Sequence, residues 1–321
     1  MHAPSTEPRR PPTPGPERSW GEGLSCYWHD PSAGIAGFHR IGHLPNEQRT
    51  KIWMGLVTPW ARYRQCDEFV VFSPNDRTAT TRNVRGLTMT LHEHGVRIEY
   101  NSADCRADIE LLELHEPVDF HSSPSSAAGS SYTTMTGHGH VEAAGTVRGT
   151  VSLAEREHRI EGRGVRAHSW GPRNVSAIRA TRWMTGSAGS RTAFFGTKTF
   201  MASGESVLKA FILRDGVVKP ARVFDVVLHT LDDGISFSGG SARFGCDDGD
   251  ELDVAIQDVA EGMAFRDGGY IGIDNPCEVL VDGHPGHAEV QISNNTFGGA
   301  EMPPILLRAM VLNGCIRSDT T

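Results

Sequence analysis

Hydrophobic and polar residues alternate with a period of two along most of the chain. The alternation is clearest in segments 86–93, 95–100, 146–153, 251–258 and 287–293. In the first of these, Leu87, Met89 and Leu91 would share one face of a strand. No convincing helical stripe longer than about two turns interrupts the pattern. One hydrophobic and one polar face are typical of antiparallel sheets, so the sequence predicts an all-β protein.

Asp-Gly dipeptides separate the predicted strands in the second half of the chain. They recur at similar intervals, beginning at Asp215, Asp233, Asp248, Asp267 and Asp282. Asp-Gly favours tight hairpins because both residues tolerate positive φ. The spacing predicts successive up-and-down hairpins, and closing them into a barrel would remove exposed sheet edges.

The length of the chain predicts two folded domains. Its 321 residues exceed the size at which single cores stop growing, about 250 to 300 residues. We expect two antiparallel β-barrels or sandwiches, with the N-terminal domain at 19–165 and the C-terminal domain at 166–321. Residues 1–18 contain six prolines and almost no apolar side chains, which predicts a disordered tail.

Composition and charge exclude several classes of partner. The formal net charge is -8 and the basic residues are scattered, so we expect no nucleic acid partner. No apolar run is long enough to span a membrane, and the N-terminus lacks a secretory signal pattern, so we expect a cytoplasmic protein without membrane insertion. The six cysteines are widely spaced, which favours free thiols in a reducing compartment.

Common cofactor and nucleophile motifs are missing from the sequence. It contains no dinucleotide-binding glycine fingerprint, P-loop, HExxH motif or GxSxG elbow, so we expect no cofactor. His-x-His pairs occur at His92/His94 and His138/His140, and such a pair can project to one face of a strand as a metal site requires. The first pair lies opposite an apolar face and the second lies between glycines, so we expect no metal at either.

Two segments concentrate polar and aromatic side chains. The stretch 26–48 contains Tyr27, Trp28, His29 and Asp30 and ends near a Pro-Asn-Glu turn. It is either an ordinary first strand with its turn or the lining of a pocket.

The segment 162–174, GRGVRAHSWGPRN, is more crowded. Arg166, His168 and Trp170 alternate with small residues, so their side chains would face one way on a strand. Burying a guanidinium beside an imidazole is costly without partners, and such groups are often functional. The alternative is a clamp between the domains, with an arginine bound to a carboxylate.

At these residues the sequence resembles a known group of proteins. The matching stretches are GFHRIGHLPNEQ (37–48), HVEAAGTVRGTV (140–151), GRGVRAHSWGPRN (162–174) and GHAEVQISN (286–294). They are similar to the lipocalin-like two-domain superfamily of carotenoid 1,2-hydratase (hydroxyneurosporene synthase), bacterial meroterpenoid cyclases and Diels-Alderases. The resemblance implies two lipocalin-like β domains packed side by side, a pocket in or between them, and a cofactor-free reaction of a hydrophobic substrate.

The resemblance directs attention to particular side chains. We expect His168 to act as an acid/base group or as a donor to a carbonyl, and Arg173 or Arg166 to hold an anionic group. Large side chains would line the pocket or stabilise a cation, and the candidates are Tyr27, Trp28, Trp53, Trp170 and Trp183.

Three carboxyl residues are further candidates. Asp30 and Glu47 are expected as catalytic acids and Glu289 as a pocket residue, because burial in an apolar pocket can raise a carboxyl pKa. One departure from the family matters here: the position before the histidine of the HSWG motif is usually Asp in the nearest relatives, and here it is Ala167.

The resulting hypothesis is a cofactor-independent cyclase or hydratase acting on a terpenoid or polyketide intermediate. Proton-initiated chemistry and shape-directed pericyclic chemistry both fit such a pocket. The alternative is a non-catalytic carrier of a lipophilic small molecule. The expected partner is a hydrophobic small molecule, and exposed sheet edges are compatible with a homodimer.

Overall fold

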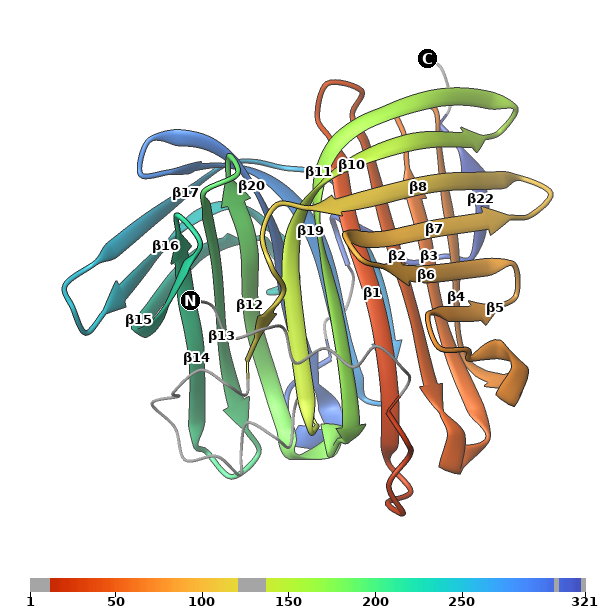
Figure 1. Ribbon diagram of the computed structural model, residues 1–321, viewed down its shortest axis with the longest axis horizontal. Coiled ribbons are helices and arrows are strands. Elements are labelled where there is room, and N and C mark those ends of the chain that lie inside the picture. The colour runs from red at the N-terminus through yellow and green to blue at the C-terminus, as the bar shows by residue number, and fades with distance from the viewer. Residues whose placement is uncertain (1–11, 121–136, 303–305, 319–321) are drawn as a thin grey trace.

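The fold consists of two curled β-sheets that lie side by side (Figure 1). The computed structural model describes residues 12–120, 137–302 and 306–318. Strands dominate these residues, and their helices are short 3-10 turns: η1 (Pro45–Glu47), η2 (Pro74–Asp76), η3 (Val175–Ala177) and η4 (Thr296–Gly298). The prediction of two antiparallel β domains packed side by side is confirmed.

The first sheet, here called the first module, has twelve strands in the described residues, in the order β22-β4-β3-β2-β1-β11-β10-β8-β7-β6-β5, with β9 paired to β10. Its strands are β1 (Trp20–Asp30), β2 (Ile35–Leu44), β3 (Arg49–Val57), β4 (Ala61–Val71), β5 (Thr81–Val84), β6 (Leu87–His92), β7 (Gly95–Asn101), β8 (Cys105–Glu113), β9 (Val118–Asp119), β10 (Gly139–Leu153), β11 (Arg156–Pro172) and β22 (Gly314–Arg317). In Figure 1, β6 to β8 cross β1 and β2 steeply, so the sheet folds over its own core.

The second sheet, the second module, is largely a closed barrel. Its described strands are β12 (Ile178–Ala188), β13 (Thr192–Met201), β14 (Ser206–Arg214), β15 (Val217–Thr230), β16 (Phe237–Cys246), β17 (Glu251–Val259), β18 (Gly262–Asp267), β19 (Tyr270–Val281), β20 (His284–Asn295) and β21 (Ala309–Met310). Pairing of β17 with β19 closes the ring, while β18 and β21 lie outside it. Buried phenylalanines fill the barrel core, namely Phe194, Phe224, Phe237 and Phe244.

The Asp-Gly dipeptides lie at the hairpin turns that the sequence predicts. The pairs beginning at Asp215 and Asp282 join β14 to β15 and β19 to β20, and in both pairs each residue has positive φ. Those at Asp233 and Asp248 lie between β15 and β16 and between β16 and β17, and Asp267 is the last residue of β18, at the turn to β19. The turn chemistry therefore determines the meander of the second module.

Strands at the junction are buried on both faces. Every residue from Gly23 to Asp30 of β1 is buried, whereas β7 alternates between buried and exposed residues. The reason is that β1, β2, β10 and β11 contact their own core on one side and the second module on the other. A separate apolar cluster that includes Tyr27, Phe38, Trp53 and Phe265 joins the modules.

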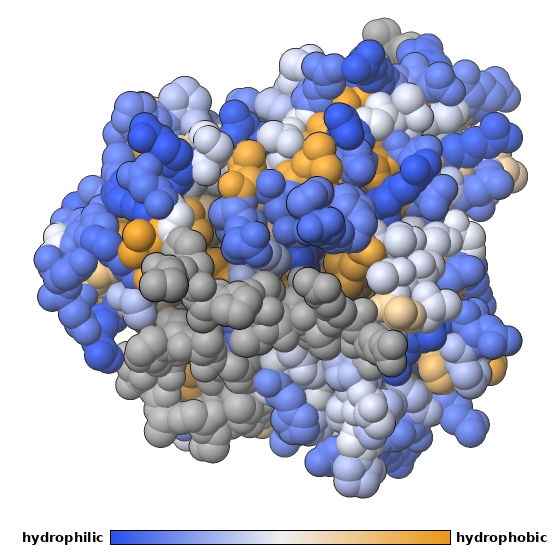
Figure 2. Space-filling model, in the orientation of Figure 1, coloured by the Kyte–Doolittle hydropathy of each residue, from blue (hydrophilic) through white to orange (hydrophobic). Residues whose placement is uncertain are grey.

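The chain passes from one sheet to the other after β11. The sequence places the domain division between residues 165 and 166, a position within β11, and the change of sheet comes at residues 173–177. The chain later returns, because β22 pairs with β4 of the first module. The face shown in Figure 2 is mostly hydrophilic, with hydrophobic residues near the middle of the view. Within the described ranges, no helix has the length and hydrophobicity needed to cross a membrane.

Candidate functional site

The candidate site lies where the two modules meet. Facing strands enclose a cavity of about 30 Å³, here called the inter-module cavity. It is bordered by Ser25, Tyr27, Arg40, Glu142, Val165, Arg166, Ala167, Trp183, Thr185, Asp274, Glu289 and Gln291. A volume of this size holds roughly one or two water molecules, so the lipid-sized chamber expected from the sequence is not present as such.

Three buried carboxyl side chains face this cavity. Glu142, Asp274 and Glu289 are at most 3% exposed. One oxygen of Glu142, one of Asp274 and both of Glu289 have no hydrogen-bond partner among the described residues. The bound oxygens have defined partners: His140 Nε2 lies 2.9 Å from Glu142 Oε1, and Gln291 Nε2 donates to Asp274 Oδ1 at 2.6 Å. Glu142 and Asp274 are therefore each held by one hydrogen bond, while Glu289 has none from a described residue, and all three keep at least one unpartnered oxygen at the cavity.

Burial favours the protonated form of these acids. It raises the pKa of Glu142 and of Glu289 well above the usual range, and the charge of Asp274 raises that of Glu289 further. Burial also raises the pKa of Asp274, to about 7, although the Gln291 hydrogen bond and the charge of Arg40 oppose the shift. Two acids that cannot both ionise cheaply share a proton near neutral pH. The site can therefore donate a proton.

An open cleft of about 290 Å³ adjoins the cavity, and Arg40 borders both. The cleft is bordered by Ser19, Gly21, Glu22, Gly23, Arg40, Gly42, His43, Leu44, Glu47, Arg49, Lys51, Trp53, Arg173, Asn174, Val175, Ser176 and Asp267. Three predicted site residues therefore lie here: Glu47, Trp53 and Arg173. Glu47 accepts a hydrogen bond from Arg49 Nε at 2.6 Å, and Arg173 donates to Ser169 Oγ.

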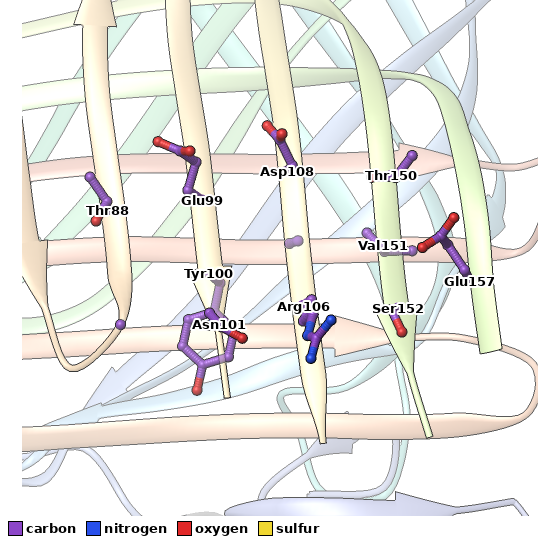
Figure 3. A pocket seen from close by; sticks show the side chains of 12 residues that line it. Thr88, Glu99, Tyr100, Asn101, Arg106, Asp108, Thr150, Val151, Ser152 and Glu157 are labelled. Carbon is purple, nitrogen blue, oxygen red and sulfur yellow. The ribbon is translucent and has the colours of Figure 1, made fainter. Parts of the chain in front are cut away.

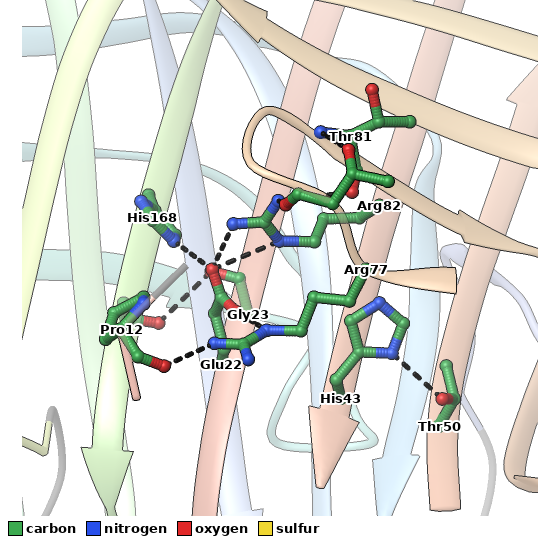
Figure 4. Close-up of polar contacts among 11 residues, drawn as sticks. Pro12, Glu22, Gly23, His43, Thr50, Arg77, Thr81, Arg82 and His168 are labelled. Atoms are coloured by element: carbon green, nitrogen blue, oxygen red, sulfur yellow. Dashed lines mark hydrogen bonds and ion pairs between the residues drawn. The ribbon is translucent and has the colours of Figure 1, made fainter. Parts of the chain in front are cut away.

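His168 lies elsewhere, in a buried polar cluster of the first module (Figure 4). Its Nε2 is 2.8 Å from Glu22 Oε1, and Glu22 also accepts hydrogen bonds from Arg77 and Arg82. Burial alone raises the pKa of Glu22, but the His168 hydrogen bond and the charges of His168, Arg82 and Arg77 together lower it to about 2. This Glu22 cluster is thus a permanently charged and fully paired group.

The crowded segment alternates as predicted, but His168 lies in the Glu22 cluster with Trp170 beside it, whereas Arg166 borders the inter-module cavity. His168 pairs in register with Leu24, which lies in the core of the first module. The ring of Trp170 lies next to His168, with centroids 5.2 Å apart. Ala167, of the opposite parity, borders the inter-module cavity and lies directly across from Ser25 and Glu142. The imidazole and the indole were predicted to point into the pocket, but they lie on the opposite face of β11.

The other predicted residues are divided between the two locations. Tyr27, Trp183 and Glu289 border the inter-module cavity. Arg166 borders it too, and its guanidinium pairs with Glu113, with Nε 2.7 Å from Oε1. Trp28 donates from Nε1 to His39 Nε2 at 2.9 Å inside the first module.

Asp30 has a local role at the end of β1. Its carboxylate accepts hydrogen bonds from the Ser32 hydroxyl and from the backbone N–H groups of Ala33 and Glu161. It does not border the inter-module cavity.

Sequence reasoning missed Arg40, Glu142, Asp274 and Gln291. A signal was present for two of them, because apolar residues adjoin Glu142 and Asp274 in sequence: Val141 and Ala143 flank Glu142, and Ile273 precedes Asp274. The contact between these strands could not be foreseen, since they come from separate modules.

A larger hollow of about 500 Å³ lies on the first module, against β7, β8 and β10 (Figure 3). Its acidic residues Glu99, Asp108 and Glu157 are exposed, so water satisfies them. We therefore take the inter-module cavity as the candidate site. Across the described residues, no cluster of three or more His, Cys, Asp or Glu is arranged to hold a metal ion.

Solved structures with the same fold were found at low sequence identity. A Nitrosomonas europaea protein provisionally named ATTH aligns with a TM-score of 0.58 at 10% identity, covering 86% of this chain and 92% of that one. Kievitone hydratase from Nectria haematococca aligns with a TM-score of 0.56 at 11% identity, covering 86% and 89%. CghA bound to Sch210972 aligns with a TM-score of 0.55 at 9% identity, with the same coverage. These neighbours show that the chain shares their fold, in agreement with the two β domains that the resemblance implies.

Comparison with curated proteins gave no match. A family model, described as a domain of unknown function (DUF7064), matches residues 4–296, which is most of the chain. The chain therefore belongs to the DUF7064 family.

Proposed function

We propose that this protein is a cofactor-independent enzyme of the hydratase or cyclase type, acting on a hydrophobic small molecule between the two modules. The observation that carries the proposal is the trio of buried carboxyl groups, Glu142, Asp274 and Glu289, with unpartnered oxygens facing one cavity. Such groups destabilise a fold and are concentrated where chemistry needs them. A hydratase among the structures of the same fold supports this assignment.

Glu289 is the group that we assign as proton donor. Its raised pKa keeps it protonated at neutral pH, and neither of its oxygens is engaged by a described neighbour. Transfer of its proton to one carbon of an alkene forms a C–H bond, leaving a cation on the other carbon and a carboxylate on Glu289. The rings of Tyr27 and Trp183, which border the cavity, would stabilise that cation through their faces.

The cation can react in two ways, which define the two activities. In a hydratase, water adds through its oxygen and releases a proton that restores the acid. In a cyclase, a second double bond of the same molecule attacks the cation, and loss of a proton from a neighbouring carbon restores the acid. Asp274, with a pKa of about 7, is suited to receive that proton, and its transfer from Asp274 to the Glu289 carboxylate restores the donor. Neither route requires an oxidant, a reductant or a cofactor.

The volumes set a condition on substrate binding. The inter-module cavity, of about 30 Å³, is far smaller than ligand pockets of about 300 to 1,000 Å³. The adjoining cleft supplies about 290 Å³. We therefore infer that the substrate occupies the cleft and extends its reactive carbons past Arg40 toward the acids, with the two walls separating as it enters.

The test uses small-molecule extracts of the producing cells. Purified protein is incubated with the extract in ordinary water, in oxygen-labelled water and in deuterium oxide, and the mixtures are compared by mass spectrometry. A hydratase product gains one water and its oxygen label, whereas a cyclase product keeps the precursor mass and acquires one deuterium. Glu289→Gln should abolish either change, and Glu278→Gln, an exposed glutamate on β19, should not.

Two results would count against parts of this proposal. If no compound is consumed and one is retained unchanged, the protein is a carrier. If Glu289→Gln converts the precursor as fast as the wild type, the assignment of the donor is wrong. The filled barrel of the second module favours the junction, rather than the barrel, as the binding site in either case.

A further inference from the structure

We propose that Arg40 is a recognition site for an anionic head group, so that the molecule bound at the junction is an amphiphilic carboxylic acid. Its carboxylate would lie on Arg40 and its hydrophobic part would extend toward the inter-module cavity. Calling this molecule a substrate rests on the proposed function. The binding site itself rests on the position, pairing and surroundings of Arg40.

Arg40 occupies the boundary between the open and the closed space. It belongs to β2, pairs in register with Ser25 of β1, and borders both the cleft and the cavity. The side chain is only partly buried, so a ligand in the cleft can reach it. A head group held there would place the adjoining carbons next to the three acids.

The guanidinium of Arg40 differs from Arg49 and Lys51, two other cations of the cleft, in its pairing. Arg49 pairs with Glu47 and Lys51 pairs with Asp267. Within the described residues, no carboxylate lies within ion-pair distance of Arg40 and no neighbour accepts a hydrogen bond from it. A partly buried guanidinium with free donors is suited to a bidentate bond with a carboxylate.

The surroundings hold this guanidinium in one orientation. Its Cζ lies 4.8 Å from the ring centroid of Trp53, which in turn stacks on Phe265 with centroids 4.4 Å apart. It also lies close to Gly23, where an added Cβ would be 2.8 Å from Arg40 Nη2. A planar cation fixed between an indole and a glycine backbone loses little freedom on binding an anion.

Charge couples this site to the acids. The positive charge of Arg40 opposes the rise in the pKa of Asp274. A bound carboxylate would neutralise that charge, so the pKa of Asp274 should rise above about 7 and the group should take up a proton. Binding of an anionic ligand would thereby favour the protonated, donating form of the site.

The test measures binding without turnover. Decanoate and decanol are titrated into the full chain at neutral pH, with affinity read by calorimetry. Decanoate should bind at least about tenfold more tightly than decanol, the size expected of a charge-assisted pair. Arg40→Gln should remove this preference, whereas Arg148→Gln, an exposed arginine of the same module, should leave it intact.

A second variant covers a failure of Arg40→Gln to fold. Gly23→Ala keeps the charge but fills the space beside Nη2, so it should weaken decanoate binding and leave decanol binding unchanged. Equal affinities for the two probes in the wild type, or a preference that survives both variants, would overturn the proposal.

The result of this binding test can be distinguished from the result of the extract test of the proposed function. If decanoate binding depends on Arg40 but no extract compound is converted, the protein binds amphiphilic acids without catalysis. If an uncharged compound is converted and Arg40→Gln has no effect on its KM, the proposed enzymatic function holds. The proposal that Arg40 binds an anionic head group is then wrong.

Discussion

Two buried sites in this molecule shift the pKa of a carboxyl group in opposite directions. In the Glu22 cluster, one carboxylate accepts hydrogen bonds from His168, Arg77 and Arg82, and its pKa falls to about 2. At the inter-module cavity, Glu289 has no hydrogen-bonded neighbour in the described residues, and its pKa rises well above the usual range. Both side chains are nearly inaccessible to water, so burial alone does not distinguish them.

The difference lies in what compensates the lost hydration. Arginines and a histidine replace water around Glu22, so its charge is retained and the group joins β1, β11 and β5 as a structural clamp. At the cavity the only cation close enough to affect Asp274 is Arg40, and it forms no ion pair there within the described chain. Partnered acids of this kind contribute to folding, and unpartnered ones are available for proton transfer.

The largest effect is expected at the unpartnered site. Glu289→Gln removes the donated proton while preserving shape, so kcat should fall about 100- to 10,000-fold, the range for loss of a general acid. Thermal stability should be unchanged or slightly higher, because an amide costs less to bury than an acid that must stay protonated. Turnover assays and thermal unfolding check both statements, and a large loss of stability would contradict the comparison.

The Glu22 cluster should behave in the reverse way. Glu22→Gln leaves Arg77 and Arg82 without their carboxylate, so the free energy of unfolding at pH 7 should drop by about 3 to 5 kcal/mol. Urea unfolding measures this. Glu110→Gln, which breaks a more exposed pair with Arg148, serves as the control and should change stability little.

The pH dependence of that loss follows from the lowered pKa. A carboxylate with a depressed folded-state pKa contributes stability above its unfolded value, near 4.5, and the contribution is lost as pH falls toward about 2. The difference in free energy of unfolding between the wild type and Glu22→Gln should therefore decrease as the pH falls from about 4.5 to about 2. A difference that is constant from pH 7 to pH 2 would contradict the charged assignment.

A smaller effect on stability, opposite in sign to that of Glu22→Gln, is expected from Asp274→Asn. Its folded-state pKa, about 7, lies above the unfolded value near 3.8, so the wild type loses stability as pH rises between these values. Asp274→Asn should match the wild type at pH 4 and exceed it in stability at pH 9. Parallel urea titrations at the two pH values provide the measurement, and equal stabilities at pH 9 would contradict a raised pKa.

Features of the fold that depend on neighbouring residues could be predicted from the sequence. Alternation and Asp-Gly turns depend on neighbouring residues, so strands and hairpins such as the turn at Asp282 were predictable. The alternation of Arg166, His168 and Trp170 was predictable for the same reason. Which face of β11 meets the second module was not, because a strand buried on both faces carries no inside or outside signal.

The site itself depends on contacts distant in sequence. Arg40, Glu142 and Asp274 come from β2, β10 and β19, and only the docking of the two modules places them around one cavity. Tyr27, Trp183 and Glu289 were chosen by residue type, and they do border that cavity, while their roles stay predictions. A polar residue inside an apolar strand has the same appearance in sequence whether it is paired, like Glu22, or unpaired, like Glu289.

The smallest effect concerns Ala167, at the position where the resemblance implies Asp. It lies directly across from Glu142 on the neighbouring strand, at a distance where cross-strand side chains interact. Glu142→Gln should lower turnover about tenfold, because the oxygen facing the cavity loses its proton. Adding Ala167→Asp to that variant places a carboxyl group from the opposite strand into the same space, and should restore turnover about threefold.

The same substitution should cost some stability. A further buried carboxyl group without a partner lowers the free energy of unfolding by about 1 to 3 kcal/mol, so the double variant should be more active but less stable than Glu142→Gln alone. Turnover and urea unfolding of the single and double variants test this together. Restoration without loss of stability would mean that the new aspartate has found a partner, and no restoration would mean that the acid must project from β10 to reach the substrate.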